Sequence, residues 1–174
     1  MAERRELLAM AAVGIAAAAA GVVLGPRMAG SPGGAEALRS ASFMDLSGKP
    51  RRLAEWDGRI LVVNFWATWC PPCREEIPAL VRVRDKLHLS GVEFVGIALD
   101  QEPKVREFAR NVQISYPLLL ADGSGLDLVR KLGNLGGGLP FTIVLDHEGT
   151  IAHRNLGALT QQNMEDQLRP MLKA

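Results

Sequence analysis

The chain has 174 residues, of which 48% are hydrophobic and 22% charged, and it contains 18 glycines and 10 prolines. This composition is ordinary for about one globular domain and excludes collagen-like, coiled-coil and wholly disordered proteins. Its 20 basic and 19 acidic residues leave a net charge of +1, so we expect no nucleic-acid partner, and two cysteines are too few for a disulfide-dense scaffold.

Residues 1–24 predict a membrane anchor or a signal segment. The pair Arg4-Arg5 precedes an uncharged, alanine-rich run of 18 residues, 7–24. As a helix this run extends about 27 Å, close to the roughly 30 Å hydrocarbon core of a bilayer. A cleaved signal usually has a shorter apolar run, and Pro26 is a poor neighbour for cleavage, so we favour an uncleaved anchor over an exported soluble protein or a twin-arginine signal. The basic residues keep the N-terminus in the cytoplasm and put the remaining chain outside the cytoplasmic membrane.

Residues 25–34 are rich in glycine and proline and predict a flexible linker, after which one domain covers residues 35–174. The domain opens with two short β segments, residues 43–46 and 51–53. Gly48 lies in the turn between them, which predicts a β-hairpin.

Two apolar runs of strand length, residues 60–65 and 92–99, are typical of buried strands in α/β proteins. Apolar residues at helical spacing over residues 77–87 predict a helix between them. The further predicted elements are a helix over residues 102–112 capped by Asp100, a strand over 116–120, a helix over 126–132, strands over 141–145 and 150–156 joined by a hairpin turn, and a final helix over 161–172 that Pro170 should shorten. Strands alternating with helices before a terminal hairpin predict an α/β fold with a central mixed sheet flanked by helices.

Both cysteines, Cys70 and Cys73, fall where the first buried strand ends and a helix begins. The free N–H groups and the dipole of a helix N-terminus favour a thiolate, and a spacing of three residues lets the second sulfur reach the first. Pro71 and Pro72 suit the first helical turn, where no N–H partner is needed. We therefore predict dithiol–disulfide exchange, in which Cys70 attacks a substrate disulfide and Cys73 resolves the mixed disulfide.

A structural disulfide and a metal site are the competing interpretations of this pair. A ring this small restricts the unfolded chain little and stabilises the fold weakly. A metal needs about four ligands, and His88, His147 and His153 lie far from the cysteines in sequence without metal-ligand spacing. We expect surface positions for these histidines, and neither a metal nor a cofactor.

The segment over residues 64–78, Asn-Phe-Trp-Ala-Thr-Trp-Cys-Pro-Pro-Cys-Arg-Glu-Glu-Ile-Pro, resembles the active-site segment of the thioredoxin superfamily. Within the superfamily it is similar to the membrane-anchored, extracytoplasmic TlpA/ResA-like reductases, and Pro78 matches the proline that kinks their active-site helix. The resemblance runs from about residue 43 to 168. It implies a thioredoxin-like fold, to which the hairpin of residues 43–53 is an N-terminal extension.

A second segment, Gly-Leu-Pro-Phe-Thr at residues 138–142, matches the family segment in which a cis proline faces the dithiol. In the family a substrate strand pairs with the backbone just before that proline. The resemblance therefore implies that Leu139 and Pro140 contact substrate. We expect Trp69 beside the thiol as part of the same docking surface, and Trp66 in the core.

Glu76 lies one helical turn after Cys73 and matches a glutamate near the dithiol of the ResA-like branch. If buried, it has a raised pKa and can exchange protons with the thiols, whereas a solvated carboxylate, as expected for Glu75, cannot. Asn64 stands where cytoplasmic thioredoxins have a buried aspartate, which leaves Glu76 as the candidate proton acceptor. The alternative for Asn64 is a buried amide satisfied by the backbone.

The resemblance implies a membrane-tethered reductase of exported proteins, such as apocytochrome c or copper-site proteins, re-reduced by a membrane-embedded thiol carrier. Relatives specialised for cytochrome maturation have glutamate directly after the cis proline. Because this position is Phe141 here, apocytochrome c is the less favoured substrate. Direction depends on redox potential, which leaves a disulfide oxidant or isomerase open. Two further alternatives fit less well. A thiol peroxidase has the pattern Pro-x-x-x-Thr-x-x-Cys, but here Asn64 replaces the proline and Thr68 lies only two residues before Cys70. A copper chaperone could use His153 as a distal ligand, but such proteins have a wider cysteine spacing.

Overall fold

The computed structural model describes residues 32–173. The membrane anchor or signal segment predicted over residues 1–24 lies outside them, and within the described range no helix is long and apolar enough to cross a bilayer. The helices and strands, in chain order, are α2 (Pro32–Ser40), β1 (Ser42–Asp45), β2 (Pro50–Arg52), β3 (Ile60–Trp66), α3 (Pro71–Leu87), β4 (Val92–Ala98), α4 (Glu102–Val112), β5 (Leu118–Leu120), α5 (Gly123–Lys131), β6 (Phe141–Leu145), β7 (Ile151–Leu156) and α6 (Gln161–Leu168).

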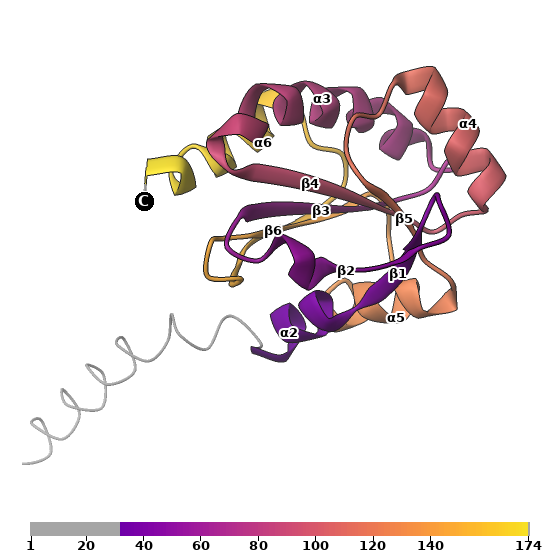
Figure 1. Cartoon of the computed structure of the whole chain (residues 1–174), viewed down its shortest axis with the longest axis horizontal. Coiled ribbons are helices and arrows are strands. Elements are labelled where there is room, and N and C mark those ends of the chain that lie inside the picture. Colours follow the sequence, from indigo (N-terminus) through magenta and orange to yellow (C-terminus); the bar gives the residue numbers. More distant parts are fainter. Residues whose placement is uncertain (1–31, 174) are drawn as a thin grey trace, which may run out of the picture. The chain divides into compact units, whose positions relative to one another are not determined.

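In residues 32–173 the strands form one seven-stranded sheet in the order β2-β1-β5-β4-β3-β6-β7. Strands β3, β4 and β5 run parallel, and β6 pairs antiparallel with β3. Helices α3, α4 and α6 lie on one face of the sheet and α2 and α5 on the other (Figure 1). The predicted α/β fold, with a mixed sheet flanked by helices and the N-terminal hairpin β1–β2, is confirmed.

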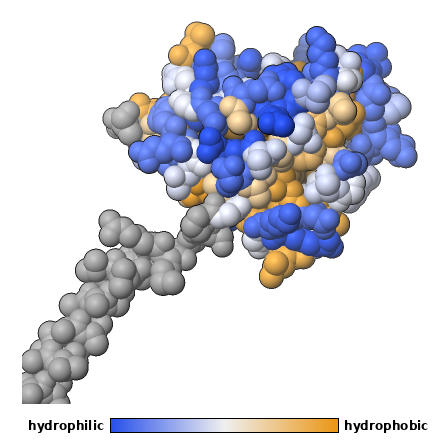
Figure 2. Space-filling model, turned by 60° about the horizontal axis from the view of Figure 1, so that its bottom comes forward, coloured by the Kyte–Doolittle hydropathy of each residue, from blue (hydrophilic) through white to orange (hydrophobic). Residues whose placement is uncertain are grey.

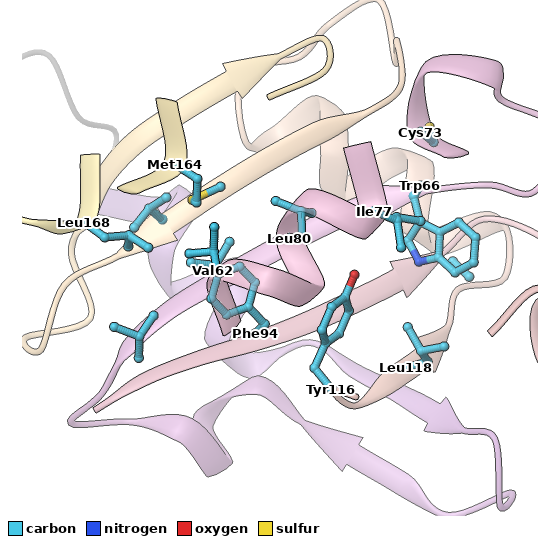
Figure 3. Close-up of a cluster of buried hydrophobic side chains, with 14 of the residues drawn as sticks. Val62, Trp66, Cys73, Ile77, Leu80, Phe94, Tyr116, Leu118, Met164 and Leu168 are labelled. Carbon is cyan, nitrogen blue, oxygen red and sulfur yellow. The ribbon is translucent and has the colours of Figure 1, made fainter. Parts of the chain in front are cut away.

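Strand β3 separates two hydrophobic cores, because successive side chains of a strand point to opposite faces of the sheet. Every residue of β3 is buried. The surface, by contrast, is mostly hydrophilic on the face drawn in Figure 2, where apolar residues form a band between the hydrophilic ones. Val62 and Trp66 pack with the core under α3 and α6 (Figure 3), and Val63 and Phe65 with the core on the other face. The strand that carries the dithiol at its end is thus held from both sides.

The two hairpins are closed by the same four-residue pattern, Asp-x-x-Gly. In each turn one carboxylate oxygen of the aspartate, Asp45 or Asp146, accepts two backbone N–H groups at 2.8–3.0 Å. The closing glycines, Gly48 and Gly149, have φ of 78° and 76°, a conformation that L side chains rarely adopt. Both predicted hairpins are confirmed.

Helix α2 is not predicted by the sequence pattern, and its first three residues belong to the linker predicted over residues 25–34. Two glycines in nine residues make its intrinsic helix propensity low. Tertiary contacts compensate: Leu38 is completely buried in the core, and the Arg39 Nε donates to the Asp57 carboxylate at 2.9 Å. The short helix therefore depends on packing rather than on its own sequence.

Two helix boundaries follow from local chemistry. Helix α5 begins at Gly123, three residues before the predicted start at Leu126, because the carboxylate of Asp122 caps it by accepting the N–H two residues on at 2.9 Å. Helix α6 ends at Leu168, so the expected shortening before Pro170 is confirmed.

Candidate active site

Cys70 and Cys73 are joined by a disulfide, with their Cα atoms 5.3 Å apart, where β3 leads into α3. Cys70 is the N-cap residue of α3, and its Sγ accepts a hydrogen bond from the Cys73 N–H at 3.3 Å. Pro71 and Pro72 occupy the first helical turn, as predicted. The N–H donor and the helix N-terminus both stabilise negative charge on the Cys70 sulfur, so the reduced site favours a thiolate there.

The two sulfurs differ in accessibility. Cys70 keeps 4% of its surface exposed, whereas Cys73 has none and packs into the hydrophobic core. A client sulfur can therefore reach Cys70 first, with Cys73 waiting beneath it. This is the geometry that an attacking and a resolving thiol require; the roles themselves stay predictions.

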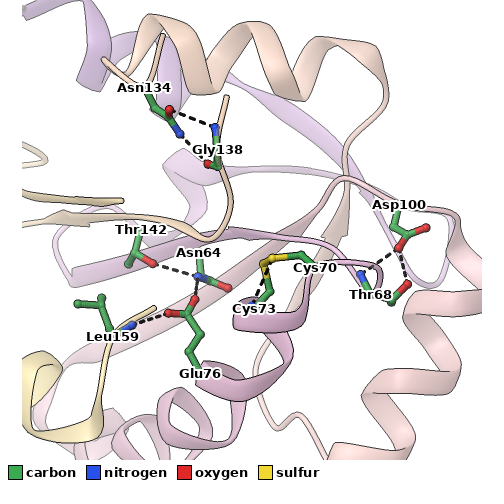
Figure 4. Close-up of a disulfide and its surroundings, with 10 residues drawn as sticks. All are labelled: Asn64, Thr68, Cys70, Cys73, Glu76, Asp100, Asn134, Gly138, Thr142 and Leu159. Carbon is green, nitrogen blue, oxygen red and sulfur yellow. Dashed lines mark hydrogen bonds between the residues drawn. A yellow bond between two sulfur atoms is a disulfide. The ribbon is translucent and has the colours of Figure 1, made fainter. Parts of the chain in front are cut away.

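The loop before Cys70 is anchored by Asp100, at the end of β4. Its carboxylate accepts hydrogen bonds from the Thr68 N–H at 2.9 Å and from the Thr68 hydroxyl (Figure 4). The prediction that Asp100 caps α4 is wrong, because the N-cap residue is Gln101. Burial opposes ionisation, but the hydrogen bonds from Thr68 and Gln101 hold the pKa of Asp100 below its ordinary value. The sequence signal for this role is a carboxylate directly after a buried parallel strand, at the edge where β3 also ends.

We expect Asp100→Ala to lower the free energy of unfolding by about 1–3 kcal/mol, because it leaves both Thr68 donors without their acceptor. Urea unfolding followed by circular dichroism measures the change. Glu75→Ala, at an exposed position of α3, is the control and should stay within about 0.5 kcal/mol of the wild type. Coincident unfolding curves for the two variants contradict the anchoring role of Asp100.

The peptide bond between Leu139 and Pro140 is cis, as predicted. The Pro140 carbonyl accepts a hydrogen bond from the Gly157 N–H at 2.9 Å, which fastens the loop to the end of β7. Within residues 32–173, neither the N–H nor the C=O of Leu139 has a hydrogen-bond partner. Such an unpaired N–H and C=O can pair with an extended segment of another chain.

Apolar side chains surround this part of the surface. Five large hydrophobic residues in the described range are exposed, and three of them lie in the segments next to the dithiol and the cis proline: Trp69, Leu135 and Leu156. Trp69, 64% exposed, and Leu139 also line a groove of about 640 Å³ at the ends of β4 and β5. Exposed apolar surface beside a reactive thiol is typical of a site that docks a protein chain. Trp66 is in the core, as predicted.

A buried polar network of Glu76, Asn64 and Thr142 lies beside the disulfide (Figure 4). The Asn64 Nδ2 donates to Glu76 Oε1 at 2.6 Å and to the Thr142 Oγ1 at 2.9 Å, and the Leu159 N–H donates to Glu76 Oε2 at 2.8 Å. Burial raises the pKa of Glu76 to about 7, although both hydrogen bonds to its carboxylate lower it. The group can therefore hold or release a proton near neutral pH, as an acid–base catalyst must. Glu75 is exposed, as predicted.

Asn64 is buried, but the alternative that the backbone satisfies its amide is wrong, since its partners are the side chains of Glu76 and Thr142. Its Oδ1 is buried, accepts no hydrogen bond from the described residues, and lies on the side of Cys73 in Figure 4. A primary amide offers a donor and an acceptor, so after a half-turn Asn64 can accept from protonated Glu76 instead of donating to the carboxylate. Either protonation state of Glu76 then has a partner. Thr142 comes from β6, 78 positions along the chain, and has no sequence signal of its own.

In residues 32–173 no group of three or more His, Cys, Asp or Glu side chains is placed to hold a metal ion. His147 is exposed, and His88 and His153 are partly exposed. His153, the distal ligand of the copper-chaperone alternative, lies on β7 beside residues of α6.

A family model described as Redoxin matches residues 33–170. The thioredoxin-like protein YneN of Bacillus subtilis is 34% identical over 131 residues, 73% of this chain and 74% of its own. The thiol-disulfide oxidoreductase ResA of Bacillus cereus is 28% identical over 126 residues, 72% of this chain and 70% of its own. The crystal structure of a thiol:disulfide interchange protein from Chlorobium tepidum TLS superposes with a TM-score of 0.67 at 34% identity, covering 77% of this chain and 94% of that one. The chain therefore belongs to the Redoxin family, with the thioredoxin fold and the paired cysteines of a thiol-disulfide oxidoreductase.

Proposed function

We propose that this protein reduces disulfide bonds of exported proteins on the outer side of the cytoplasmic membrane. The observation that carries the proposal is the dithiol, with Cys70 accessible at the head of α3 and Cys73 fully buried under it. The relative ResA, a thiol-disulfide oxidoreductase, supports the chemistry. The uncharged run of residues 7–24 supports an anchored, extracytoplasmic location.

The reaction starts from the reduced protein. The Cys70 thiolate attacks one sulfur of a client disulfide, and the other client sulfur leaves as a thiolate. Cys73, once deprotonated, attacks the Cys70 sulfur of this mixed disulfide and displaces the second client thiolate. Both client thiolates take up protons, two electrons have passed to the client, and the protein is left with the Cys70–Cys73 disulfide of this structure.

Glu76 is the proton acceptor for Cys73 in this scheme. A fully buried thiol cannot lose its proton directly to bulk water, and Glu76 lies one helical turn away on the same face of α3. Its pKa of about 7 suits a group that takes a proton and then releases it. In Figure 4 the Asn64 amide lies beside both the carboxyl group and the disulfide, and its hydrogen bond to Glu76 holds the carboxyl group in place.

The client docks on the backbone before the cis proline. The unpaired N–H and C=O of Leu139 add a strand of the client to the site. The family resemblance, in which the proline after this residue faces the dithiol, supports this docking position. Trp69, next to Cys70 in the chain, supplies exposed apolar surface and lines the same groove as Leu139. Because this pairing uses the main chain, it suits many client sequences.

A membrane-embedded thiol carrier re-reduces the protein, since the extracytoplasmic space is kept oxidising. Tethering the domain beside such a carrier raises its effective concentration, to about millimolar for a short linker. Direction then depends on this electron supply rather than on the fold.

Whole-cell thiol trapping tests the direction. Cells expressing the chain are quenched with acid and treated with a maleimide reagent that adds mass to each free thiol. We expect Cys70 and Cys73 to be found mainly as thiols at steady state, because the carrier keeps a reductase charged. A variant with both cysteines replaced by serine marks the unmodified position on the gel. A pair found mainly as the disulfide contradicts the reductase and favours the oxidant.

A further inference from the structure

The docking backbone at Leu139 directly follows three consecutive glycines, residues 136–138. Glycine has the widest conformational freedom of all residues, and Gly137 adopts φ of 65°. A segment that binds through its own N–H and C=O loses affinity if it must first be ordered. The constraint on this loop must therefore come from outside the glycines.

Asn134 makes the contacts that supply this constraint. Its Nδ2 donates to the Gly138 carbonyl at 2.8 Å, and its Oδ1 accepts from the Gly138 N–H at 3.3 Å (Figure 4). Its own carbonyl accepts the Gly137 N–H at 3.0 Å, and its N–H donates to the Val129 carbonyl of α5 at 3.2 Å. One residue thus ties Gly137 and Gly138 to the end of a helix.

Asn134 is buried, with 6% of its residue surface exposed.

We propose that Asn134 is a positioning residue for client docking, a role that rests on the proposed reduction of protein disulfides. A primary amide carries a donor and an acceptor side by side, as a peptide group does. It pairs with both backbone groups of Gly138 and so holds the next residue, Leu139, ready to pair with the client. Asn134 itself contacts neither sulfur in the hydrogen-bond network of the described residues.

The test compares a protein disulfide with a small one. Pre-reduced protein is mixed in a stopped-flow instrument with insulin, or with the small aromatic disulfide dithiobis(nitrobenzoate), which is too small to pair with the loop as a strand. For Asn134→Ala we expect the second-order rate constant with insulin to fall about tenfold, because two hydrogen bonds to the docking loop are lost. The rate constant with the small disulfide should stay within about twofold of the wild type.

Alanine retains the two backbone bonds of residue 134, and among the described non-glycine residues only Gln113 has a positive φ, so alanine can adopt this conformation. Asn134→Asp is the second variant. Aspartate is nearly isosteric with asparagine, so the variant leaves no cavity, and it keeps the acceptor for the Gly138 N–H. The donor to the Gly138 carbonyl is lost, because a carboxylate oxygen takes its place. We expect the same selective loss with insulin.

Gln167→Ala is the matched control. It breaks another reciprocal amide pair, in which Gln167 and Asn155 exchange two hydrogen bonds of 3.0 Å between α6 and β7. Both of its rate constants should stay within about twofold of the wild type. Either an unchanged insulin rate in both Asn134 variants or a parallel fall of both rates overturns the positioning role. A wild-type protein that fails to reduce insulin overturns the proposed function itself, and the positioning role with it.

Discussion

Replacing Cys70 by serine is expected to lower the rate of disulfide reduction by at least about a thousandfold. The thiolate at the head of α3 is the only nucleophile that the scheme uses against a client, and a serine hydroxyl neither ionises near neutral pH nor exchanges with disulfides. Single-turnover stopped-flow with insulin measures the loss. Cys73→Ser should keep the first step, because its Cys70 thiol is intact, and lose only the release of the client.

Serine is close to cysteine in size, so both variants should fold, and circular dichroism of each provides the control. The contrast between them is the informative part. If Cys70→Ser retains more than a few per cent of the wild-type rate, or if Cys73→Ser loses the first step as completely as Cys70→Ser, the assignment of attacking and resolving thiols fails.

Glu76→Gln is expected to be more stable than the wild type by about 3 kcal/mol above neutral pH and to match it below about pH 4. Burial raises the pKa of Glu76 from 4.5 to about 7, so the folded protein keeps a proton that the unfolded chain has already released. Wild-type stability therefore falls as pH rises from about 4.5 to 7 and stays lowered above it, by about 1.4 kcal/mol for each pKa unit. Glutamine has no such titration, and Asn64 can turn its Oδ1 toward the glutamine amide.

Urea unfolding of the oxidised wild type and Glu76→Gln across this pH range gives the difference directly. Glu75→Gln, on the exposed side of α3, serves as the control and should show no pH-dependent gain. A constant difference between Glu76→Gln and the wild type at all pH values contradicts the raised pKa of Glu76.

The same variant tests the catalytic role of Glu76. We measure alkylation of Cys70 by iodoacetamide against pH, and the rate of client release after the first step. With Glu76 titrating near pH 7, the wild-type profiles should show an inflection there that Glu76→Gln lacks, and release should be slower in the variant. If the two proteins titrate identically, proton exchange between Glu76 and the thiols is ruled out.

Local sequence patterns were sufficient for the elements that their own residues determine. The continuous apolar runs of β3 and β4 predicted their positions to within a residue, and the helix over Glu102–Val112 agrees at both ends. Helix α2 could not be predicted in this way, because its glycines argue against a helix. It depends on tertiary contacts, the burial of Leu38 in the core and the hydrogen bond from Arg39 to Asp57. Strand β5 is shorter than the run of residues 116–120 that predicted it, since residue pairs with β4 form only over Leu118–Leu120. Pro117 contributes one carbonyl, which accepts the Gly96 N–H at 3.0 Å.

In the candidate site, too, some residues are evident from the local sequence and others only from contacts with distant residues. Cys70, Cys73 and Glu76 could be found because their spacing along one helix carries the chemistry, and the family resemblance added Leu139 and Pro140. Thr142 could not, because its partner Asn64 lies 78 positions away. The position of Asp100 after a buried strand is a signal, but its partner Thr68, 32 positions away, is not evident from the sequence. Asn134 is different: its partner Gly138 is only four residues on. An asparagine two residues before a run of three glycines is therefore a usable sequence signal for such a contact.

Capture of clients by Cys73→Ser in living cells tests most directly whether Cys70 attacks client disulfides and Cys73 releases them. Without the resolving sulfur, Cys73 cannot displace the client from the mixed disulfide with Cys70. After acid quenching, non-reducing electrophoresis should therefore show adducts of higher mass, which a reductant cleaves. Mass spectrometry should locate the linkage at Cys70 and identify exported proteins as the attached partners. Absence of adducts in Cys73→Ser, or equal amounts in a Cys70→Ser strain, contradicts the account.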